Sequence, residues 1–410
     1  MKICIFTNHF YPEDFKVNDI AFELQKKGFE ISVITAVPDY PQGKYYKGYG
    51  IFKRNNEVVN NCKVYRLPVI PRGNGNAIQL VLNYASYFIS ASIFTFFHKL
   101  FFKYDAVFVH LTSPFFIGTC AVQLKKWQKI PLVFWTLDLW PESLTAAAGI
   151  HNSFILRSQI NMVKKVYDNC DKILIGSKGF EQSICEKGNY HDKLVYFPNW
   201  AETTNQNIDF RDYQSIEPFS LFSEDDFVIL FAGNIGESQN LDCLLDAAEE
   251  LKSFNHIKFV LLGDGRARAR LQKKVNEKKL GNTVFFPGRF PLKMMPFFMN
   301  KADVLYVSLK DELIFRLTVP SKVQFYMSQA KPILALLNGD GANLINETAC
   351  GIAVSNSTDL VSAIKKFLNK PKSELKEMGL RGKTYYEKNF TKNDRIEQLA
   401  TLLLTITHDH

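Results

Sequence analysis

Cysteine is scarce and scattered in this chain of 410 residues. The seven cysteines stand at positions 4, 62, 120, 170, 185, 243 and 350, with no C-x-x-C pair and no His/Cys cluster. This spacing supports neither a disulfide framework nor a zinc site. A signal peptide is also lacking, because the apolar stretch after Met1-Lys2 ends at Phe6. We therefore expect a reduced, cytoplasmic compartment.

The common nucleotide-binding fingerprints are missing as well. The G-x-G triplets at 48–50, 73–75, 263–265 and 339–341 lack a third glycine at the required spacing, and no G-x-x-x-x-G-K-[ST] occurs. A dehydrogenase and a P-loop enzyme are thereby disfavoured. No D-x-D occurs either, so a divalent cation on a sugar nucleotide would have no obvious carboxylate ligands. We expect no metal and no other cofactor.

Acidic residues are few in the first half of the chain. Residues 1–200 hold 23 Lys/Arg and 15 Asp/Glu, a balance of +8, whereas residues 201–410 hold 27 and 26, a balance of +1. A chain of this length exceeds the size of a single hydrophobic core and predicts two domains. The excess positive charge thus belongs to one of the two domains, and it calls for an explanation.

Charge is absent between Arg72 and Lys99, where residues 77–97 form an apolar stretch long enough to span a bilayer. Six polar residues interrupt that stretch. We favour a buried helix of the first domain. A helix lying on a membrane surface and a true membrane span remain the alternatives.

A basic segment precedes this stretch. Residues 42–72 contain seven Lys/Arg against Glu57 alone, a balance of +6, with tyrosine and phenylalanine interleaved. Such a cluster favours an anionic membrane surface, and a solvated basic loop is the alternative. No nucleic-acid recognition motif accompanies it, so we expect no nucleic-acid partner.

Short apolar runs alternate with helix-length amphipathic stretches along both halves. This pattern predicts an α/β fold with two doubly wound parallel sheets. The alternation breaks over 195–226, which we interpret as the domain junction. The prediction is a first domain over 1–200 and a second over 201–390, with a ligand cleft between them.

Three loops that follow strands of the second domain lead into predicted helices and suit an anion. They are Gly233-Asn234-Ile235-Gly236, Pro320-Ser321-Lys322 and Gly339-Asp340-Gly341-Ala342. Glycine lets the backbone approach phosphate oxygens, and a helix start favours negative charge. Each loop alone is more simply a turn; together the three indicate a diphosphate ligand.

The first domain offers fewer chemical residues. Glu13 lies in the loop after the first strand, His110 ends the strand AVFVH, and Asp138 follows the strand PLVFW. A histidine at a strand end is more often structural, and Asp138 could equally cap a turn. None of them forms a nucleophilic triad with neighbouring residue types.

The chain resembles retaining glycosyltransferases of family 4 with the GT-B fold. The resemblance rests on TNHFYPE, GNIGESQNLDCLLDAAEEL, VLLGDG, VFFPGR and the long segment from PSKVQFYMSQ to CGIAV, and it covers essentially the whole chain. PDYPQGKYYKGY, LDLWPESL and TVPSK are similar to the bacterial branch of fucosamine and N-acetylaminosugar transferases that build surface polysaccharides.

The resemblance implies a role for each domain. The second domain would bind a UDP-sugar donor, the first a lipid-diphosphate-linked glycan acceptor, and the helix near 391–406, within a returning segment 391–410, would pack on the first domain. The implied donor-binding residues are Gly233, Asn234, Gly236, Arg289, Lys310, Arg316, Ser321, Lys322, Gly341 and Ala342. The implied acceptor-side residues are Glu13, Asn18, Lys44, His110 and Glu142, with Asp138 as the catalytic candidate.

The chain departs from the family pattern at several positions. Leu317 and Phe325 replace the Glu-x7-Glu pair, and Leu137 replaces a histidine beside the retained Asp138. Asn234 and the pair Gln239-Asn240 stand where the family has Arg and Lys, so Lys310, Arg316 and Lys322 would have to meet the diphosphate charge.

We therefore expect a metal-independent aminosugar transferase that is peripheral at the inner face of the plasma membrane and serves O-antigen or capsule synthesis. A GT-B-shaped sugar-nucleotide epimerase and a catalytically silent nucleotide-sugar-binding subunit are the alternatives.

Overall fold

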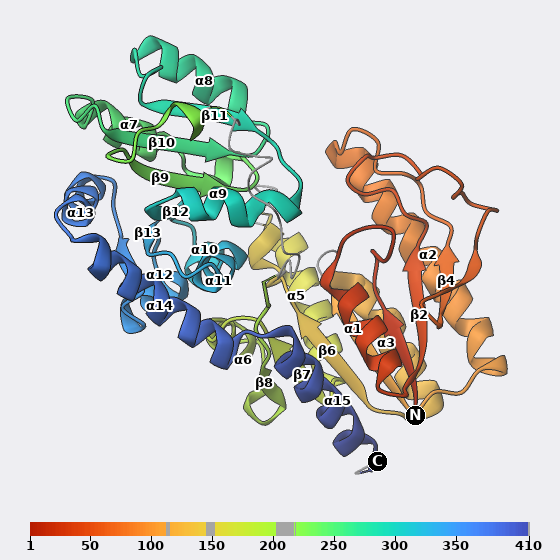
Figure 1. The fold of residues 1–410 in the computed structure, drawn as a ribbon. Coiled ribbons are helices and arrows are strands. Elements are labelled where there is room, and N and C mark those ends of the chain that lie inside the picture. Colours follow the sequence, from red (N-terminus) through yellow and green to blue (C-terminus); the bar gives the residue numbers. More distant parts are fainter. Residues whose placement is uncertain (112–114, 145–151, 202–216, 218, 409–410) are drawn as a thin grey trace. The chain divides into compact units, whose positions relative to one another are not determined.

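The structure, a computed structural model, describes residues 1–111, 115–144, 152–201, 217 and 219–408. It divides into two compact units (Figure 1). Unit 1 comprises Met1–Pro198 and Asn393–His410, and unit 2 comprises Asn199–Lys392. Residues 202–216 and 218 of the predicted junction lie outside the described residues.

Unit 1 is built on an eight-stranded sheet in the order β3-β4-β2-β1-β5-β6-β7-β8, in which β3 alone pairs antiparallel. Its strands are β1 (Lys2–Phe6), β2 (Glu30–Ala36), β3 (Asn56–Val59), β4 (Cys62–Leu67), β5 (Ala106–Leu111), β6 (Leu132–Thr136), β7 (Lys172–Ile175) and β8 (Leu194–Tyr196). Its helices are α1 (Lys16–Lys26), α2 (Ala77–Phe101), α3 (Gly118–Gln128), α5 (Ser153–Asp168), α6 (Phe180–Cys185) and α15 (Lys392–His408).

Unit 2 is built on a parallel sheet in the order β11-β10-β9-β12-β13-β14. Its strands are β9 (Phe227–Ala232), β10 (Ile257–Leu262), β11 (Val284–Gly288), β12 (Val304–Ser308), β13 (Ile333–Leu336) and β14 (Gly351–Val354). Its helices are α7 (Asp242–Glu250), α8 (Arg268–Glu277), α9 (Met295–Lys301), α10 (Leu313–Arg316), α11 (Ser321–Ser328), α12 (Asp340–Glu347), α13 (Thr358–Leu368) and α14 (Lys372–Asn389). The predicted class, two doubly wound α/β domains, is confirmed.

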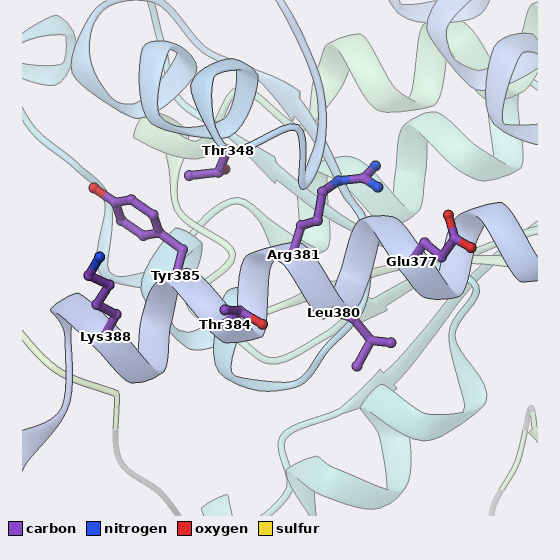
Figure 2. Close-up of a pocket in the computed structure, with 7 residues that line it drawn as sticks. All are labelled: Thr348, Glu377, Leu380, Arg381, Thr384, Tyr385 and Lys388. Atoms are coloured by element: carbon purple, nitrogen blue, oxygen red, sulfur yellow. The ribbon is translucent and has the colours of Figure 1, made fainter.

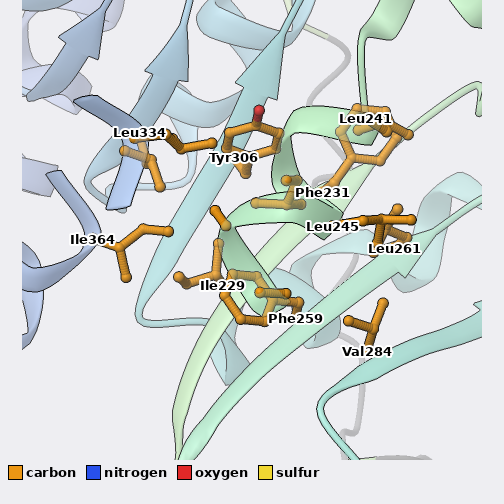
Figure 3. Packing of buried hydrophobic residues seen from close by; sticks show 14 of the residues in the cluster. Ile229, Phe231, Leu241, Leu245, Phe259, Leu261, Val284, Tyr306, Leu334 and Ile364 are labelled. Atoms are coloured by element: carbon orange, nitrogen blue, oxygen red, sulfur yellow. The ribbon is translucent and has the colours of Figure 1, made fainter. Parts of the chain in front are cut away.

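Apolar side chains project from both faces of the second sheet. Ile229 and Phe231 of β9 join one cluster with α7 and α13 (Figure 3), whereas Leu230 joins another cluster with α9 and α11. A strand that is covered on both sides needs apolar residues at successive positions, which explains the unbroken runs in the sequence. The core is what fixes the strand ends, and therefore the loops that follow them.

The last helix belongs to the first unit. Leu399 and Leu403 of α15 are fully buried, and the Gln398 Nε2 donates to the carbonyl oxygen of Tyr196 at 3.1 Å. An ion pair joins Glu397 to Lys27 at the end of α1. The chain therefore returns to unit 1 after it has built unit 2.

The favoured interpretation of residues 77–97 as a buried helix is wrong. The α2 helix forms over Ala77–Phe101 but packs through a face that holds Asn83, Tyr87, Ala91, Thr95 and His98. Nine of its apolar side chains, among them Ile78, Ile93 and Phe101, are exposed. By length and composition, α2 is the one helix in the described part of the chain that could cross a membrane.

The basic segment 42–72 is also less available than its composition predicts. Arg66 is 1% exposed, and its Nε donates to Glu57 at 2.5 Å. The guanidinium of Arg72 lies 5.1 Å from the ring centroid of Tyr40 and 5.8 Å from that of Tyr84. These two cations hold the local structure together, whereas Lys44, Lys47, Lys53, Arg54 and Lys63 are exposed.

Candidate functional site

The second sheet changes winding direction between β9 and β12, which are neighbours although far apart in sequence. In open parallel sheets, ligands bind beyond the carboxyl ends of the strands at such a switch point. The loop after β9 meets the end of β12 here, since the Lys310 N–H donates to the Ser238 carbonyl oxygen at 2.9 Å. The glycine loop after β9 and the loop that carries Lys310 therefore lie at one edge of the sheet.

Glycines let the loops of this edge lie against one another. A Cβ on Gly263 would stand 1.8 Å from the Gly233 carbonyl oxygen, and a Cβ on Gly265 would stand 2.3 Å from that of Ile235. Gly233, Gly263 and Gly265 also have positive φ values of 146°, 141° and 157°. Larger residues are excluded at Gly263 and Gly265 by backbone contact and by conformation, and at Gly233 by conformation. The glycines therefore shape the site whether or not each contacts a ligand.

Lys322 is the cation that lies against this glycine loop. It stands at the second residue of α11, its Nζ donates to Gln239 Oε1 at 2.6 Å, and the same Nζ lies 5.1 Å from the Phe231 ring centroid. A Cβ on Gly233 would stand 2.6 Å from its Cε. Burial lowers the pKa of this ammonium to about 8. A cation held in such surroundings gains much from an anionic ligand.

Two helix starts complete the edge. Ser321 opens α11 after Pro320, and α12 begins just after Gly339, whose Cβ would stand 1.9 Å from the Arg316 carbonyl oxygen. The backbone of Gly341 packs against Pro320, because a Cβ on Gly341 would stand 2.9 Å from the Pro320 Cδ. The first turns of α11 and α12 therefore lie together, with their free N–H groups at one end of unit 2.

The other predicted donor-side cations differ in availability. Arg316 is held by Asp311 through two bonds of 2.6 and 2.7 Å, which lower the pKa of that carboxyl. Lys310 and Arg289 are exposed, as is Asn234. The charge of Arg316 is thus already compensated, and Lys322 is the cation best placed by burial and by contact.

In unit 1 the corresponding switch point lies between β1 and β5. Thr7 Oγ1 and His110 Nδ1 approach to 3.3 Å across it. His110 is 1% exposed, and burial, together with nearby His9, lowers its pKa to about 3. His110 is therefore a neutral imidazole that contacts Thr7 at this edge.

Glu13 organises the loop after β1. Its Oε1 accepts from the N–H groups of Asp39 and Tyr40 at 3.0 and 2.7 Å, and its Oε2 lies 2.9 Å from His9 Nδ1. Asn18 fixes the same loop, accepting from the Tyr11 N–H at 2.9 Å and donating to the Glu13 carbonyl oxygen at 2.7 Å. Both predicted acceptor-side residues are thus engaged within the protein.

Asp138 and Glu142 have different environments. Glu142 Oε1 accepts from Lys187 Nζ at 2.6 Å and from Ser183 Oγ at 2.8 Å. Within the described part of the chain, the Asp138 carboxylate has no hydrogen-bond or ion-pair partner, and burial raises its pKa to about 6. A half-buried carboxylate without a protein partner, just past the end of β6, suits direct contact with a substrate. Lys44 is exposed on the loop after β2.

One group in unit 1 has the composition of a metal site. The ligand atoms of His9, Glu13 and Asp39 lie within 4.8 Å of one another. However, Asp39 Oδ2 accepts from the Arg72 N–H at 2.7 Å and from Asn83 Nδ2 at 3.0 Å, and Glu13 is engaged as described above. Both oxygens of Glu13 and Oδ2 of Asp39 already have protein partners, so a metal ion is not needed to explain this cluster.

A pocket of about 520 Å³ lies elsewhere, along α14 (Figure 2). Its lining residues are Thr348, Glu377, Leu380, Arg381, Thr384, Tyr385 and Lys388. None of the predicted site residues is among them, and the Arg381 Nε donates to the Ala349 carbonyl oxygen at 2.9 Å. We assign no role in donor binding to this pocket.

Comparison with protein families agrees with this geometry. Residues 17–205 match the glycosyltransferase family 4 domain, and residues 212–384 match the domain of glycosyl transferases group 1. The chain carries the two domains of a family 4, group 1 glycosyltransferase. The first unit thus corresponds to the family 4 match, and the glycine loops and Lys322 lie within the group 1 match.

Two bacterial relatives support the assignment. The chain is 25% identical over 298 residues to WcaI of Escherichia coli K12, a colanic acid biosynthesis glycosyl transferase by name, covering 70% of this chain and 72% of WcaI. It is 30% identical over 219 residues to the glycosyltransferase WbjE of Pseudomonas aeruginosa, covering 52% of this chain and 53% of WbjE.

Solved structures establish the GT-B fold for this glycosyltransferase. Sucrose-phosphate synthase from Thermosynechococcus elongatus matches over the whole of both chains with a TM-score of 0.74 and 15% identity. Anabaena HepE, solved with UDP and glucose, matches over 98% of this chain and 99% of its own with a TM-score of 0.66 and 14% identity.

Three site residues escaped the sequence analysis. Gln239 holds Lys322, Phe231 lies under the ammonium, and His9 bonds to Glu13. In the sequence, Gln239 marks only a departure from the family pattern, and its partner Lys322 stands 83 residues away. Its signal would have been the pairing of a buried amide with a half-buried lysine, which only the fold reveals.

Proposed function

We propose that this glycosyltransferase is metal-independent and retaining. It moves an N-acetylaminosugar from a UDP-sugar to a polyprenyl-diphosphate-linked glycan, in the synthesis of a bacterial surface polysaccharide. The observation that carries the proposal is Lys322, a half-buried ammonium held by Gln239 against the glycine loop at the sheet's switch point. An ammonium beside free backbone N–H groups suits a diphosphate.

The choice of donor and product class has its own support. HepE, which shares the fold, was solved with UDP, and WcaI is named for colanic acid synthesis. The proposed branch, the fucosamine and N-acetylaminosugar transferases, rests on the sequence motifs PDYPQGKYYKGY, LDLWPESL and TVPSK.

The proposed chemistry needs charge stabilisation on the leaving diphosphate. As the bond between the sugar carbon and the diphosphate breaks, negative charge grows on the phosphate oxygens. Lys322 and the helix starts at Ser321 and Asp340 supply fixed positive potential, which substitutes for a metal ion. The engaged oxygens of Glu13 and the engaged Oδ2 of Asp39 are consistent with a metal-independent reaction.

Donor binding should weaken as the pH rises. The free Lys322 has a pKa of about 8, and a bound diphosphate would raise it, so binding takes up a proton. We expect the Kd for UDP to be nearly constant below about pH 7 and to rise about tenfold per unit above about pH 8. Calorimetry in two buffers of different ionisation enthalpy measures the proton uptake, and a Kd independent of pH across this range would refute the assignment.

Asp138 is the proposed carboxylate that orients the acceptor or stabilises an oxocarbenium-like centre. Replacing Asp138 by asparagine should lower kcat about 100-fold or more and leave the Kd for UDP unchanged, since Asp138 belongs to unit 1. Activity of the unmodified enzyme should also fall as pH drops below about 6, where the carboxyl becomes protonated. Full turnover by a folded Asp138→Asn variant would exclude this role.

The proposed location is the inner face of the plasma membrane. The exposed cations of the 42–72 segment and the outward apolar residues of α2 both suit an anionic bilayer surface. Co-sedimentation with anionic vesicles at low salt tests the location; a protein that stays in the supernatant would contradict it.

A donor screen by thermal shift, followed by incubation with a short polyprenyl-diphosphate-sugar, tests the function itself. The expected product is the acceptor heavier by one aminosugar, with the donor's anomeric configuration by NMR. An epimerase would instead convert the sugar nucleotide without any acceptor. A silent subunit would bind the donor and leave both substrates intact.

A further inference from the structure

The α2 helix is inverted relative to an ordinary surface helix. Its packed face carries polar groups, such as Asn83, which bonds to Asp39, and Tyr87, whose hydroxyl donates to the Thr7 carbonyl oxygen at 2.7 Å. Its outward face is apolar and comprises Ile78, Val81, Leu82, Ile89, Ile93, Phe96, Phe97, Leu100 and Phe101, each between 46% and 78% exposed. A contiguous apolar face of this length marks an interaction surface.

The carboxyl-terminal half of α2 adds aromatic and basic groups to that face. Lys99 Nζ lies 3.5 Å from the ring centroid of Trp127, on α3, and 4.4 Å from that of Phe96. Trp127 is 40% exposed. A lysine and a tryptophan beside exposed aliphatic residues are the groups that gather at the boundary between lipid tails and headgroups.

A polar pocket of about 320 Å³ lies at the foot of α2. Three lysines line it, Lys2, Lys63 and Lys103, and Glu30 is its acidic side chain, a balance of 3 − 1 = +2. In the described part of the chain, none of these three ammonium groups has an ion-pair partner. Phe101 and Phe102, at the end of α2, line the same pocket.

We propose that this pocket takes the phosphate of an anionic phospholipid headgroup while the outward face of α2 lies in the bilayer surface. The proposal rests on the membrane location proposed above and adds the chemistry of the lipid. A cationic pocket that opens beside exposed phenylalanine and leucine is complementary to a phosphate joined to acyl chains. Neither water nor a soluble anion would account for the apolar half of the surface.

The pocket is distinct from the acceptor side of unit 1. Lys2 and Glu30 are the first residues of β1 and β2, and Lys63 is the second residue of β4. The pocket therefore lies at the amino ends of these parallel strands, whereas Glu13 and Asp138 follow carboxyl ends and His110 lies at the carboxyl end of β5. It would hold a lipid of the membrane and not the glycosyl acceptor.

The test uses the full chain and two pairs of variants. Lys63→Gln with Lys103→Gln removes pocket charge, and Lys365→Gln with Lys376→Gln, exposed in unit 2, is the control of equal charge. Ile89→Gln with Ile93→Gln, each 56% exposed, makes the outward face polar, and Val58→Gln on β3, 68% exposed, is its control. Binding is measured on phosphatidylcholine vesicles with and without phosphatidylglycerol.

We expect the unmodified protein to prefer the vesicles that contain phosphatidylglycerol. The pocket variant should lose about thirtyfold in affinity for them, the factor for two lysines near an anionic surface. The isoleucine variant should lose binding to both vesicle types, and both controls should bind as the unmodified protein does.

Three results would overturn the proposal. One is a lipid preference that survives in the pocket variant. Another is inorganic phosphate that binds, by calorimetry, as tightly as vesicles do and loses this binding in the pocket variant. The site would then serve a free anion. The third is a dimer that forms without lipid and is lost in the isoleucine variant. A second copy of the chain would then cover the outward face of α2. Sugar transfer to a detergent-solubilised acceptor is measured in parallel, so loss of the proposed function is seen separately from loss of lipid binding.

Discussion

Replacing Lys322 by methionine should lower kcat/KM for sugar transfer about 100-fold while the protein stays folded. The ammonium is the half-buried cation beside the glycine loop, and no other cation of that edge is held against Gly233 among the described residues. Methionine keeps the length and the apolar stem of lysine but cannot compensate the charge of a leaving diphosphate. The substitution should therefore slow the step in which the diphosphate leaves, without disturbing the packing of the side chain.

The stability of this variant should change by no more than about 1 kcal/mol. Burial disfavours the charged ammonium, as its lowered pKa indicates, so removing the charge is stabilising. The same substitution leaves Gln239 Oε1 without its donor, which is destabilising, and the two effects largely cancel. The matched control is Lys365→Met, an exposed lysine of α13 in the same unit. Steady-state kinetics together with thermal denaturation check the prediction, and kinetics equal to those of the control would remove Lys322 from the site.

The split between kcat and KM is informative in the same experiment. A fall in kcat and kcat/KM together indicates that Lys322 acts on charge that develops in the transition state. A rise in KM alone indicates that it binds donor and transition state equally. The first result is expected, because a leaving diphosphate carries more charge than the bound donor.

The layout of strands was predictable because buried parallel strands have a direct sequence signal. Runs such as FVILFAG and IKFVLLG are apolar at nearly every position, since both faces of the sheet are covered, and they became β9 and β10. The short antiparallel β3 was not predicted. It lies at the sheet edge, and its pattern of exposed and half-buried residues resembles a loop.

The error on α2 has a physical origin. Composition indicates how apolar a helix is but not which of its faces packs, and the usual rule places polar residues outside. Here Asn83 and His98 are buried because Asp39 and Tyr104 offer them hydrogen bonds at 3.0 and 2.6 Å. Those partners stand elsewhere in the chain, so only the fold could show that the helix is inverted.

The site was predictable where a single loop suffices, and it was not where distant segments meet. Glycines between strand and helix, and Pro320-Ser321-Lys322, have a local reason to bind an anion. The neutralisation of Arg316 by Asp311 and the engagement of Glu13 by two backbone N–H groups depend on conformation. Residue type alone left both as candidates for ligand contact.

Replacing Gly263 by alanine should destabilise unit 2 by about 3 kcal/mol or more. The new Cβ would stand 1.8 Å from the Gly233 carbonyl oxygen, and φ at this position is +141°, where an L side chain is strained. The backbone must therefore move, and it would carry Gly233 away from Lys322. We expect a lower denaturation midpoint, faster hydrogen exchange in β9 and β10, and weaker UDP binding.

Gly281→Ala is the control, because its Cβ meets nothing within 4 Å and its φ is not positive. It should change stability by less than about 0.5 kcal/mol. If Gly263→Ala behaved like this control, the close contact of the loops after β9 and β10 would not be a feature of the protein in solution.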